Sequence, residues 1–195
     1  VEVAARVELP HRIRLTVGAG LMPGPYSSAI NGFLEGVGAY DEATADLVAS
    51  TLSSSFVLRA HGGFRFFPEH GFYADGGYRL VTLGGSSEAA AIVAVATGQP
   101  VPAGEEERPV DVASTLHMID LELGWELHPI DHLIVRPSVG GAFTVGASTT
   151  IEPQFDARAR RLVEGFARYG EDFLDDTYTS YVFSPVLGIA VGYEL

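Results

Sequence analysis

The stretch LHMIDLELGWEL, from Leu116 to Leu127, places two kinds of side chain on alternate residues. One face carries His117, Ile119, Leu121, Leu123, Trp125 and Leu127. The other face carries Asp120, Glu122 and Glu126, together with Met118 and Gly124. A period of two predicts a β-strand. Because the long face is apolar and has an aromatic residue near its end, the pattern is typical of a strand with lipid outside and a polar lumen inside.

The same alternation recurs along the chain and predicts seven strands. They span Val1–Leu9, Arg12–Leu21, Ser55–Phe67, Phe72–Leu83, Thr115–Leu127, Leu133–Ala147 and Tyr178–Leu195. Short connections join them in pairs at Pro10-His11, Pro68–Gly71 and His128–His132. Three connections of about thirty residues separate the pairs: Met22–Ser54, Gly84–Ser114 and Ser148–Thr177. Short turns at one end and long loops at the other are typical of outer-membrane barrels, whose turns are periplasmic.

Composition limits the class of protein further. The 195 residues are expected to form one domain over 1–195, and no apolar run approaches the ~20 residues of a membrane-spanning helix. The chain has no Cys, which excludes disulfides, thiolate metal ligands and Cys nucleophiles. Its net charge of −13 argues against nucleic acid as a partner.

The predicted fold is all-β: an antiparallel up-and-down transmembrane β-barrel of about eight strands, seven of them visible. The first and last stretches both run toward the end with the short turns. Seven strands therefore cannot close an antiparallel barrel. We expect an additional strand before Val1, or one supplied by the loop segment Ala89–Thr97. Pro137 and Pro185 each remove a ladder donor, which predicts bulges or locally broken pairing.

Each of the three long extracellular loops is predicted to carry one short helix. Asp41 is a candidate N-cap for a helix through Leu52, and Ser86–Thr97 is rich in Ala. In the third loop, apolar residues at helical spacing precede Gly170, a candidate helix end: Phe155, Ala159, Leu162, Phe166 and Tyr169. Aromatic residues near strand ends are expected at the membrane interface, namely Trp125, Phe66, Phe67, Phe72, Tyr178, Tyr181 and Tyr193.

Charge is balanced on the predicted lumen face. That face carries seven acids: Glu2, Glu8, Asp75, Asp120, Glu122, Glu126 and Glu194. It also carries seven arginines: Arg6, Arg12, Arg14, Arg59, Arg65, Arg79 and Arg136. The entire net charge therefore lies in loops and turns. An eight-stranded barrel has an interior only about wide enough for side chains, so we predict a lumen plugged by paired charges.

Candidate chemistry is sparse. A Ser–His–acid set from Ser138, His61 and Asp75 or Asp120 can be drawn, but no nucleophile elbow supports it, and no catalytic residue is assigned. The turn residues His11, His70, His128 and His132 are interpreted as polar residues at headgroup level rather than a metal site. Acidic runs at Glu105–Glu107 and Glu171–Asp176 favour a solvated surface over Ca²⁺ binding. No cofactor or metal is predicted.

The chain ends in IAVGYEL, residues 189–195. Together with the strand pattern, this end resembles the small outer-membrane β-barrel families of the OmpA-transmembrane, OmpX and OmpW type. The resemblance implies that Tyr193 and Leu195 form the aromatic-x-apolar insertion signal, and that the protein lies among outer-membrane lipid and lipopolysaccharide of a Gram-negative bacterium. The predicted function is a structural or interaction protein that binds a partner protein, a surface polymer or a lipid through its acidic outer loops. The alternatives are a narrow channel for small apolar solutes, a lipid A or phospholipid hydrolase, and a soluble ligand-binding barrel.

Overall fold

The computed structural model describes residues 2–21, 32, 54–67, 70–89, 109–154, 160–181 and 183–193. These residues form seven long strands, one short strand and one long helix. In chain order the elements are β1 (Glu2–Leu9), η1 (Pro10–Arg12), β2 (Ile13–Leu21), β3 (Ser54–Phe67), β4 (Phe72–Glu88), β5 (Pro109–Trp125), β6 (Leu127–Ile130), β7 (Leu133–Pro153), α4 (Arg160–Tyr181) and β8 (Phe183–Tyr193).

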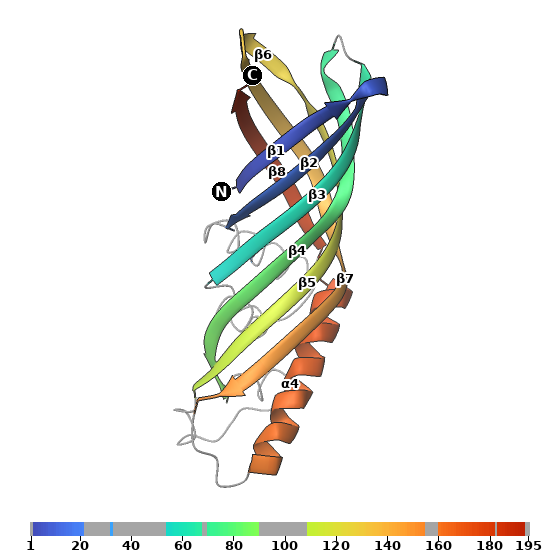
Figure 1. Ribbon diagram of the computed structural model, residues 1–195. Coiled ribbons are helices and arrows are strands. Elements are labelled where there is room, and N and C mark those ends of the chain that lie inside the picture. Colours follow the sequence, from blue (N-terminus) through green and yellow to red (C-terminus); the bar gives the residue numbers. More distant parts are fainter. Residues whose placement is uncertain are drawn as a thin grey trace.

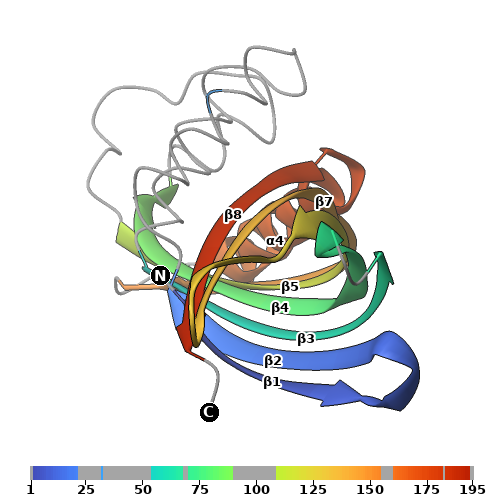
Figure 2. The same ribbon diagram turned by 90° about the horizontal axis from the view of Figure 1, so that it is seen from above.

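The strands form one antiparallel sheet in which neighbours in the sequence are neighbours in space. The short strand β6 continues β5 beyond Glu126 and pairs with the start of β7. The sheet curls into a half-barrel, with its strands steeply inclined (Figures 1 and 2). The predicted antiparallel up-and-down order is therefore confirmed, in a sheet of seven long strands.

Tight turns join the strands at one end of the sheet. The β1–β2 turn is η1, in which His11 and Arg12 adopt positive φ values of 67° and 66°. Gly71 precedes β4 with a φ of +67°, and a Cβ there would lie 2.2 Å from the carbonyl oxygen of Glu126. The β6–β7 turn contains His132 at a φ of 64°. These are the positions of the three predicted short connections.

Both edge strands run toward this turn end (Figure 1). Within the described residues, β1 pairs with β2 alone and β8 pairs with β7 alone. Parallel edges do not close an antiparallel barrel, so the need for a further strand stays a prediction. Of the candidate segment Ala89–Thr97, residues 90–97 lie outside the described part of the chain.

Helix α4 corrects the sequence analysis in two places. The predicted helix end at Gly170 is wrong, because α4 continues to Tyr181. The predicted strand start at Tyr178 is wrong for the same reason, and β8 begins only at Phe183. The physical cause is a stripe of inward positions at helical spacing that extends past the glycine: Ala167, Gly170, Leu174 and Tyr178. The predicted helix over Asp41–Leu52 lies outside the described residues, and residues 86–88 of Ser86–Thr97 belong to β4.

The concave side of the sheet has an apolar half, over which α4 packs (Figure 2). Leu174 and Tyr178 of α4 are fully buried there, so the prediction that Tyr178 is an interfacial aromatic is wrong. The backbone amide of Ile151 also donates a hydrogen bond to Oε1 of Glu171, at 2.9 Å. The strands contribute Val81, Leu83, Val110, Val112, Leu116, Met118, Ala142, Ile151 and Val186 to this core. On β5 the inner face carries the buried apolar residues Val110 and Val112 before Thr115, so this strand begins earlier than predicted.

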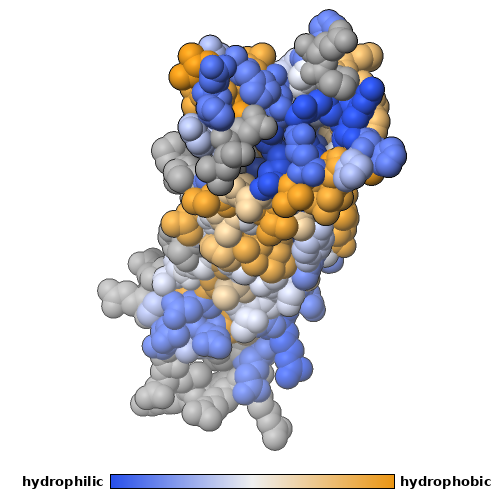
Figure 3. Space-filling model, turned by 45° about the horizontal axis from the view of Figure 1, so that its top comes forward, coloured by the Kyte–Doolittle hydropathy of each residue, from blue (hydrophilic) through white to orange (hydrophobic). Residues whose placement is uncertain are grey.

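The opposite, convex face carries exposed apolar side chains, which we call the apolar belt. It includes Val7, Leu15, Val17, Leu58, Phe64, Ile119, Leu121, Leu123, Trp125, Val139, Phe143, Leu187, Ile189 and Val191. Apolar side chains form a band across the middle of the molecule, with polar side chains toward both ends (Figure 3). Within the described residues, no helix is both long and apolar enough to cross a membrane.

The two unusual prolines behave differently. Pro137 lies opposite the break between β5 and β6, where pairing on that side of β7 is interrupted, as predicted. Pro185 pairs with Gly141 in unbroken register, so the predicted irregularity is absent there. Within the described residues β8 has a neighbour on one side only, and an edge strand tolerates a missing donor.

Candidate functional site

The candidate site is a network of charged side chains on the concave side, at the height of the apolar belt. Twelve of the fourteen charged residues predicted for the lumen form ion pairs there, in two groups. The Glu126 group consists of Arg6, Glu8, Arg14, Arg65, Asp75, Glu126 and Arg136. The His61 group consists of Glu2, Arg59, His61, Arg79, Asp120 and Glu122. Among the described residues, no ion pair joins the two groups.

The buried Glu126 carboxylate is the centre of its group. It forms ion pairs with Arg65 and Arg136, and Arg14 and Arg6 approach it at 3.8 and 4.0 Å. Its side chain is only 3% exposed. Four guanidinium groups around one buried carboxylate offset the cost of removing that charge from water.

Arg14 is the most completely buried arginine of the network, and it pairs with Asp75. Its Nε and Nη2 atoms donate to the two carboxylate oxygens of Asp75, at 2.9 and 2.8 Å. The Cζ atom lies 3.4 Å from the ring centroid of Tyr73, so the guanidinium also stacks on an aromatic face. Arg14 is 2% exposed, and a bidentate pair of this kind fixes the orientation of both side chains.

In the His61 group, two arginines share two carboxylates of β5. Arg59 Nη1 lies 3.1 Å from Oε1 of Glu122, and its Nε donates to Glu2 at 2.5 Å. Arg79 Nη2 lies 2.6 Å from Oδ2 of Asp120 and 3.4 Å from Oε1 of Glu122. The side chains of Asp120 and Glu122 are 0% and 7% exposed. The group therefore links β1, β3, β4 and β5 through charge.

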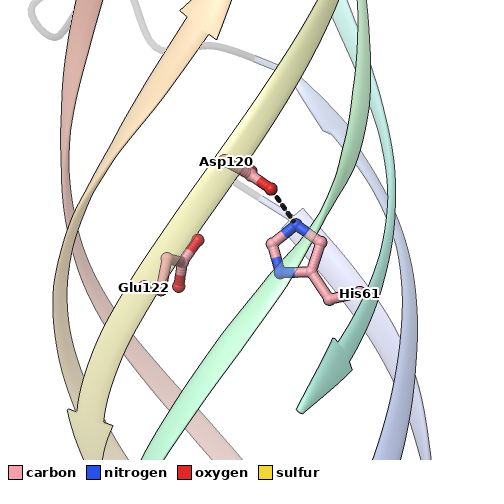
Figure 4. A group of neighbouring side chains, drawn as sticks. All are labelled: His61, Asp120 and Glu122. Carbon is pink, nitrogen blue, oxygen red and sulfur yellow. Dashed lines mark ion pairs between the residues drawn. The ribbon is translucent and has the colours of Figure 1, made fainter.

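The strand register explains how these side chains meet. His61 of β3, Gly77 of β4 and Asp120 of β5 lie in one row across the sheet. Gly77 has no side chain, so His61 and Asp120 meet across it, with Nε2 2.8 Å from Oδ1 (Figure 4). A Cβ on Gly77 would lie 2.5 Å from Cδ2 of His61. A glycine at this inner position is thus required by the contact between its neighbours.

His61 and Asp120 approach closely, but the contact does not meet the geometric criteria of a hydrogen bond. Nε2 of His61 and both carboxylate oxygens of Asp120 are buried and have no partner in hydrogen-bond geometry among the described residues. The contacts with Asp120 are close ion pairs: Oδ1 lies 2.8 Å from Nε2 of His61, and Oδ2 lies 2.6 Å from Nη2 of Arg79. Buried acceptors without such a partner are uncommon in folded proteins.

Net charge differs between the two groups. The His61 group has three carboxylates and two guanidinium groups, and it carries one excess negative charge when His61 is neutral. The Glu126 group has three carboxylates and four guanidinium groups, and it carries one excess positive charge. The network as a whole is therefore neutral, but one of its groups has an excess negative charge and the other an excess positive charge.

The hypothetical Ser–His–acid set is not assembled from Ser138. The residue that pairs with Asp120 on β7 is Ala142, whereas Ser138 pairs with Gly124. The two positions are four residues apart on β7 and therefore about 13 Å apart along the strand, at ~3.3 Å per residue. His61 pairs with Asp120 rather than with Asp75, whose carboxylate is held by Arg14.

Arg12 lies outside the network, and the turn residue His128 borders it. Arg12 is exposed and donates to the carbonyl oxygen of Phe66 at 3.4 Å. Glu194 and Leu195 lie outside the described residues, as do Glu105–Glu107. Tyr193 is exposed at the end of β8 and stacks on His132, with ring centroids 5.6 Å apart. His128 lies 3.7 Å from Glu126.

Aromatic rings cluster on the convex face near the turns. The ring of Phe72 contacts those of Phe66, Phe67 and Trp125, and Phe66 also contacts Phe64. The centroids of Phe72 and Trp125 lie 5.2 Å apart. Trp125 and Phe67 are 45% and 59% exposed, so this cluster is a surface feature at the turn end of the apolar belt.

Comparisons with protein-family models, with curated proteins and with solved structures gave no match. The resemblance to small outer-membrane barrels therefore stays a prediction from the sequence. The two charge groups and the faces of the sheet are the basis for assigning a function.

Sequence reasoning did not assign His61 to the charge network. The alternation places His61 on the inner face, but only the register shows that Gly77 separates it from Asp120. A glycine between a histidine and an acid in one row of the inner face is the signal that identifies the pair.

Proposed function

We propose that the chain is the membrane-embedded β-barrel of a Gram-negative outer-membrane protein, with a closed interior and a binding surface at the end that carries α4. One observation supports this proposal above the others: over one part of its length, the sheet has an apolar outer face and a charged inner face, the reverse of a protein in water. Between Ile119 and Leu127 its outer side chains are exposed and apolar, whereas the inner ones include buried Asp120, Glu122 and Glu126.

The dimensions of the inverted zone fit a membrane. The segment Ile119–Leu127 is nine residues long, and a tilted membrane-spanning strand has about 9–11 residues. Farther along β5, toward its N-terminal end, the polarity is the ordinary one, with Val110 and Val112 buried and Asp111 exposed. This half of the molecule has the polarity of a protein in water and would project from the lipid.

A sheet in lipid cannot leave its edge groups unsatisfied. The proposal therefore requires one more strand between β1 and β8, running antiparallel to both. That strand would give an even number, as bacterial barrels have. It would also cover the concave side beside Glu2 and Glu8, the carboxylates contributed by the edge strand β1.

The interior arrangement favours an anchor and binding protein over a conduit. At belt height the concave side is crossed by ion pairs that link β1 to β3 and β2 to β4. In the other half, Leu174 and Tyr178 of α4 occupy the concave side. Solutes would have to displace both layers, so we place function on the outer surface of α4, where Phe166, Tyr169 and Asp172 are exposed.

The experiment is membrane partition of the full chain. Expressed with an outer-membrane signal sequence, the protein should sediment with outer membranes, resist carbonate extraction and require detergent for release. Surface biotinylation of a Cys placed at exposed Arg168 of α4 should occur on intact cells, because the native chain has no Cys. Recovery in the soluble fraction as a folded protein would contradict the proposal.

A further inference from the structure

We propose that His61, Asp120 and Glu122 form a binding site for a divalent transition-metal ion of the Zn²⁺ type. Each of the three side chains offers one ligand atom, and these atoms all lie within 4.8 Å of one another. All three residues are buried, and Figure 4 shows them converging from β3 and β5. The proposal is independent of whether the chain lies in a membrane.

The donor set has the right chemistry. One imidazole nitrogen and two carboxylate oxygens are ligands that Zn²⁺ commonly takes, and a three-ligand protein site leaves a position for water. Thiolates are absent from the chain, so a softer metal ion has no preferred ligand here. Zn²⁺ is therefore the first ion to test.

The unsatisfied atoms point to a ligand independently of the clustering. Nε2 of His61 and both oxygens of Asp120 are the atoms that a bound cation would contact, and these three lack a hydrogen bond of normal geometry. The side chains of His61 and Asp120 are 3% and 0% exposed, so a ligand between them would be shielded from bulk solvent. A cation between them would be bound by the lone pairs of the unprotonated Nε2 and of the carboxylate oxygens.

Charge also favours a cation at this position. The His61 group carries one net negative charge when His61 is neutral, whereas the Glu126 group is positive. A cation is therefore attracted to the first group and repelled by the second. Arg79 is the competitor, because its Nη2 atom already lies 2.6 Å from Oδ2 of Asp120.

The test is isothermal titration of the full-length, tag-free protein in detergent micelles with ZnCl₂. We expect one ion per chain in wild type, and a loss of affinity of about tenfold or more in His61→Gln. His70→Gln is the matched control, since His70 is exposed in a turn, and it should leave the affinity unchanged. Arg79→Gln should raise the affinity because it removes the competing cation.

A second measurement uses only the wild-type protein and therefore does not depend on whether a variant folds. Co²⁺ added to the wild-type protein should broaden the amide resonances of His61, Asp120 and Glu122 before those of the turn histidines. The proposal is overturned if Zn²⁺ does not bind, if His61→Gln binds it as tightly as wild type, or if Co²⁺ broadens only His11, His70, His128 and His132. Reduced affinity in Arg79→Gln would equally contradict it.

Discussion

His61 and Asp120 lie on strands that are not adjacent, yet Nε2 of His61 is 2.8 Å from Oδ1 of Asp120. The strand between them contributes Gly77 at this row, and the absence of a side chain there brings the two buried groups together. The contact shows how the inner face of the sheet uses small residues to place large charged ones.

Gly77→Ala is predicted to destabilise the fold by about 1–3 kcal/mol. The new Cβ would lie 2.3 Å from the carbonyl oxygen of Ala60 and 2.5 Å from Cδ2 of His61, so the row has to spread. The free energy of unfolding from urea titration in micelles measures the effect. Gly62→Ala is the matched control, because its Cβ would meet only Leu15, at 3.9 Å. Equal destabilisation by both substitutions would contradict this account.

Arg14→Met is predicted to cost about 3–5 kcal/mol of unfolding free energy. It removes the bidentate partner of Asp75 and leaves that carboxylate buried without its guanidinium. Adding Asp75→Leu should recover a large part of the loss, because the unpaired charge disappears. Arg12→Met, at an exposed position outside the network, should have little effect. A double variant less stable than Arg14→Met would show that the pair itself is not the cause.

Leu174→Ala is predicted to destabilise the protein by about 2–5 kcal/mol, the usual cost of truncating a buried leucine. Leu174 is 0% exposed and joins α4 to the core of the sheet. Phe166→Ala, on the same helix but 48% exposed, serves as the control and should be nearly neutral. If both variants unfold at the wild-type urea concentration, α4 is not part of the cooperative core.

Planar lipid bilayers containing the protein are predicted to show no steady single-channel conductance. The reason is that ion pairs cross the concave side at belt height and α4 covers the other half. A regular conductance that changes in Arg59→Ala or Glu122→Ala would favour the narrow-channel alternative. Deletion of residues 160–181 tests whether α4 alone keeps the interior closed.

Much of the sheet is predictable from the sequence because a strand records its two faces on alternate residues. The stretch from Leu116 to Leu127 shows this directly: Leu121 and Trp125 are exposed, whereas Glu122 is buried. Parity alone predicts which residues of a strand share a face, but it also assigned to the inner face Arg12, which is exposed in the β1–β2 turn. Parity does not tell which charges pair, since pairing depends on register between strands.

The end of the third loop could not be predicted in the same way. Gly170 is typical of a helix end, and Tyr178–Leu195 alternates acceptably as a strand. The competing signal is tertiary: Leu174 and Tyr178 gain burial against β5 and β7 only if the helix continues. Similarly, β5 and β7 are longer than predicted where their inner faces carry Val110, Val112 and Ile151, which belong to the core that α4 joins.

The depth of Leu121 in a bilayer tests the central claim most directly. A single Cys replaces Leu121, which is 60% exposed on the convex face, and carries a nitroxide label; Thr150→Cys, exposed beyond the belt, is the control. In lipid vesicles, we predict that the label at 121 is relaxed by oxygen and protected from a water-soluble nickel chelate, whereas the label at 150 shows the reverse. Equal access of the nickel chelate to both labels would contradict the membrane-embedded barrel.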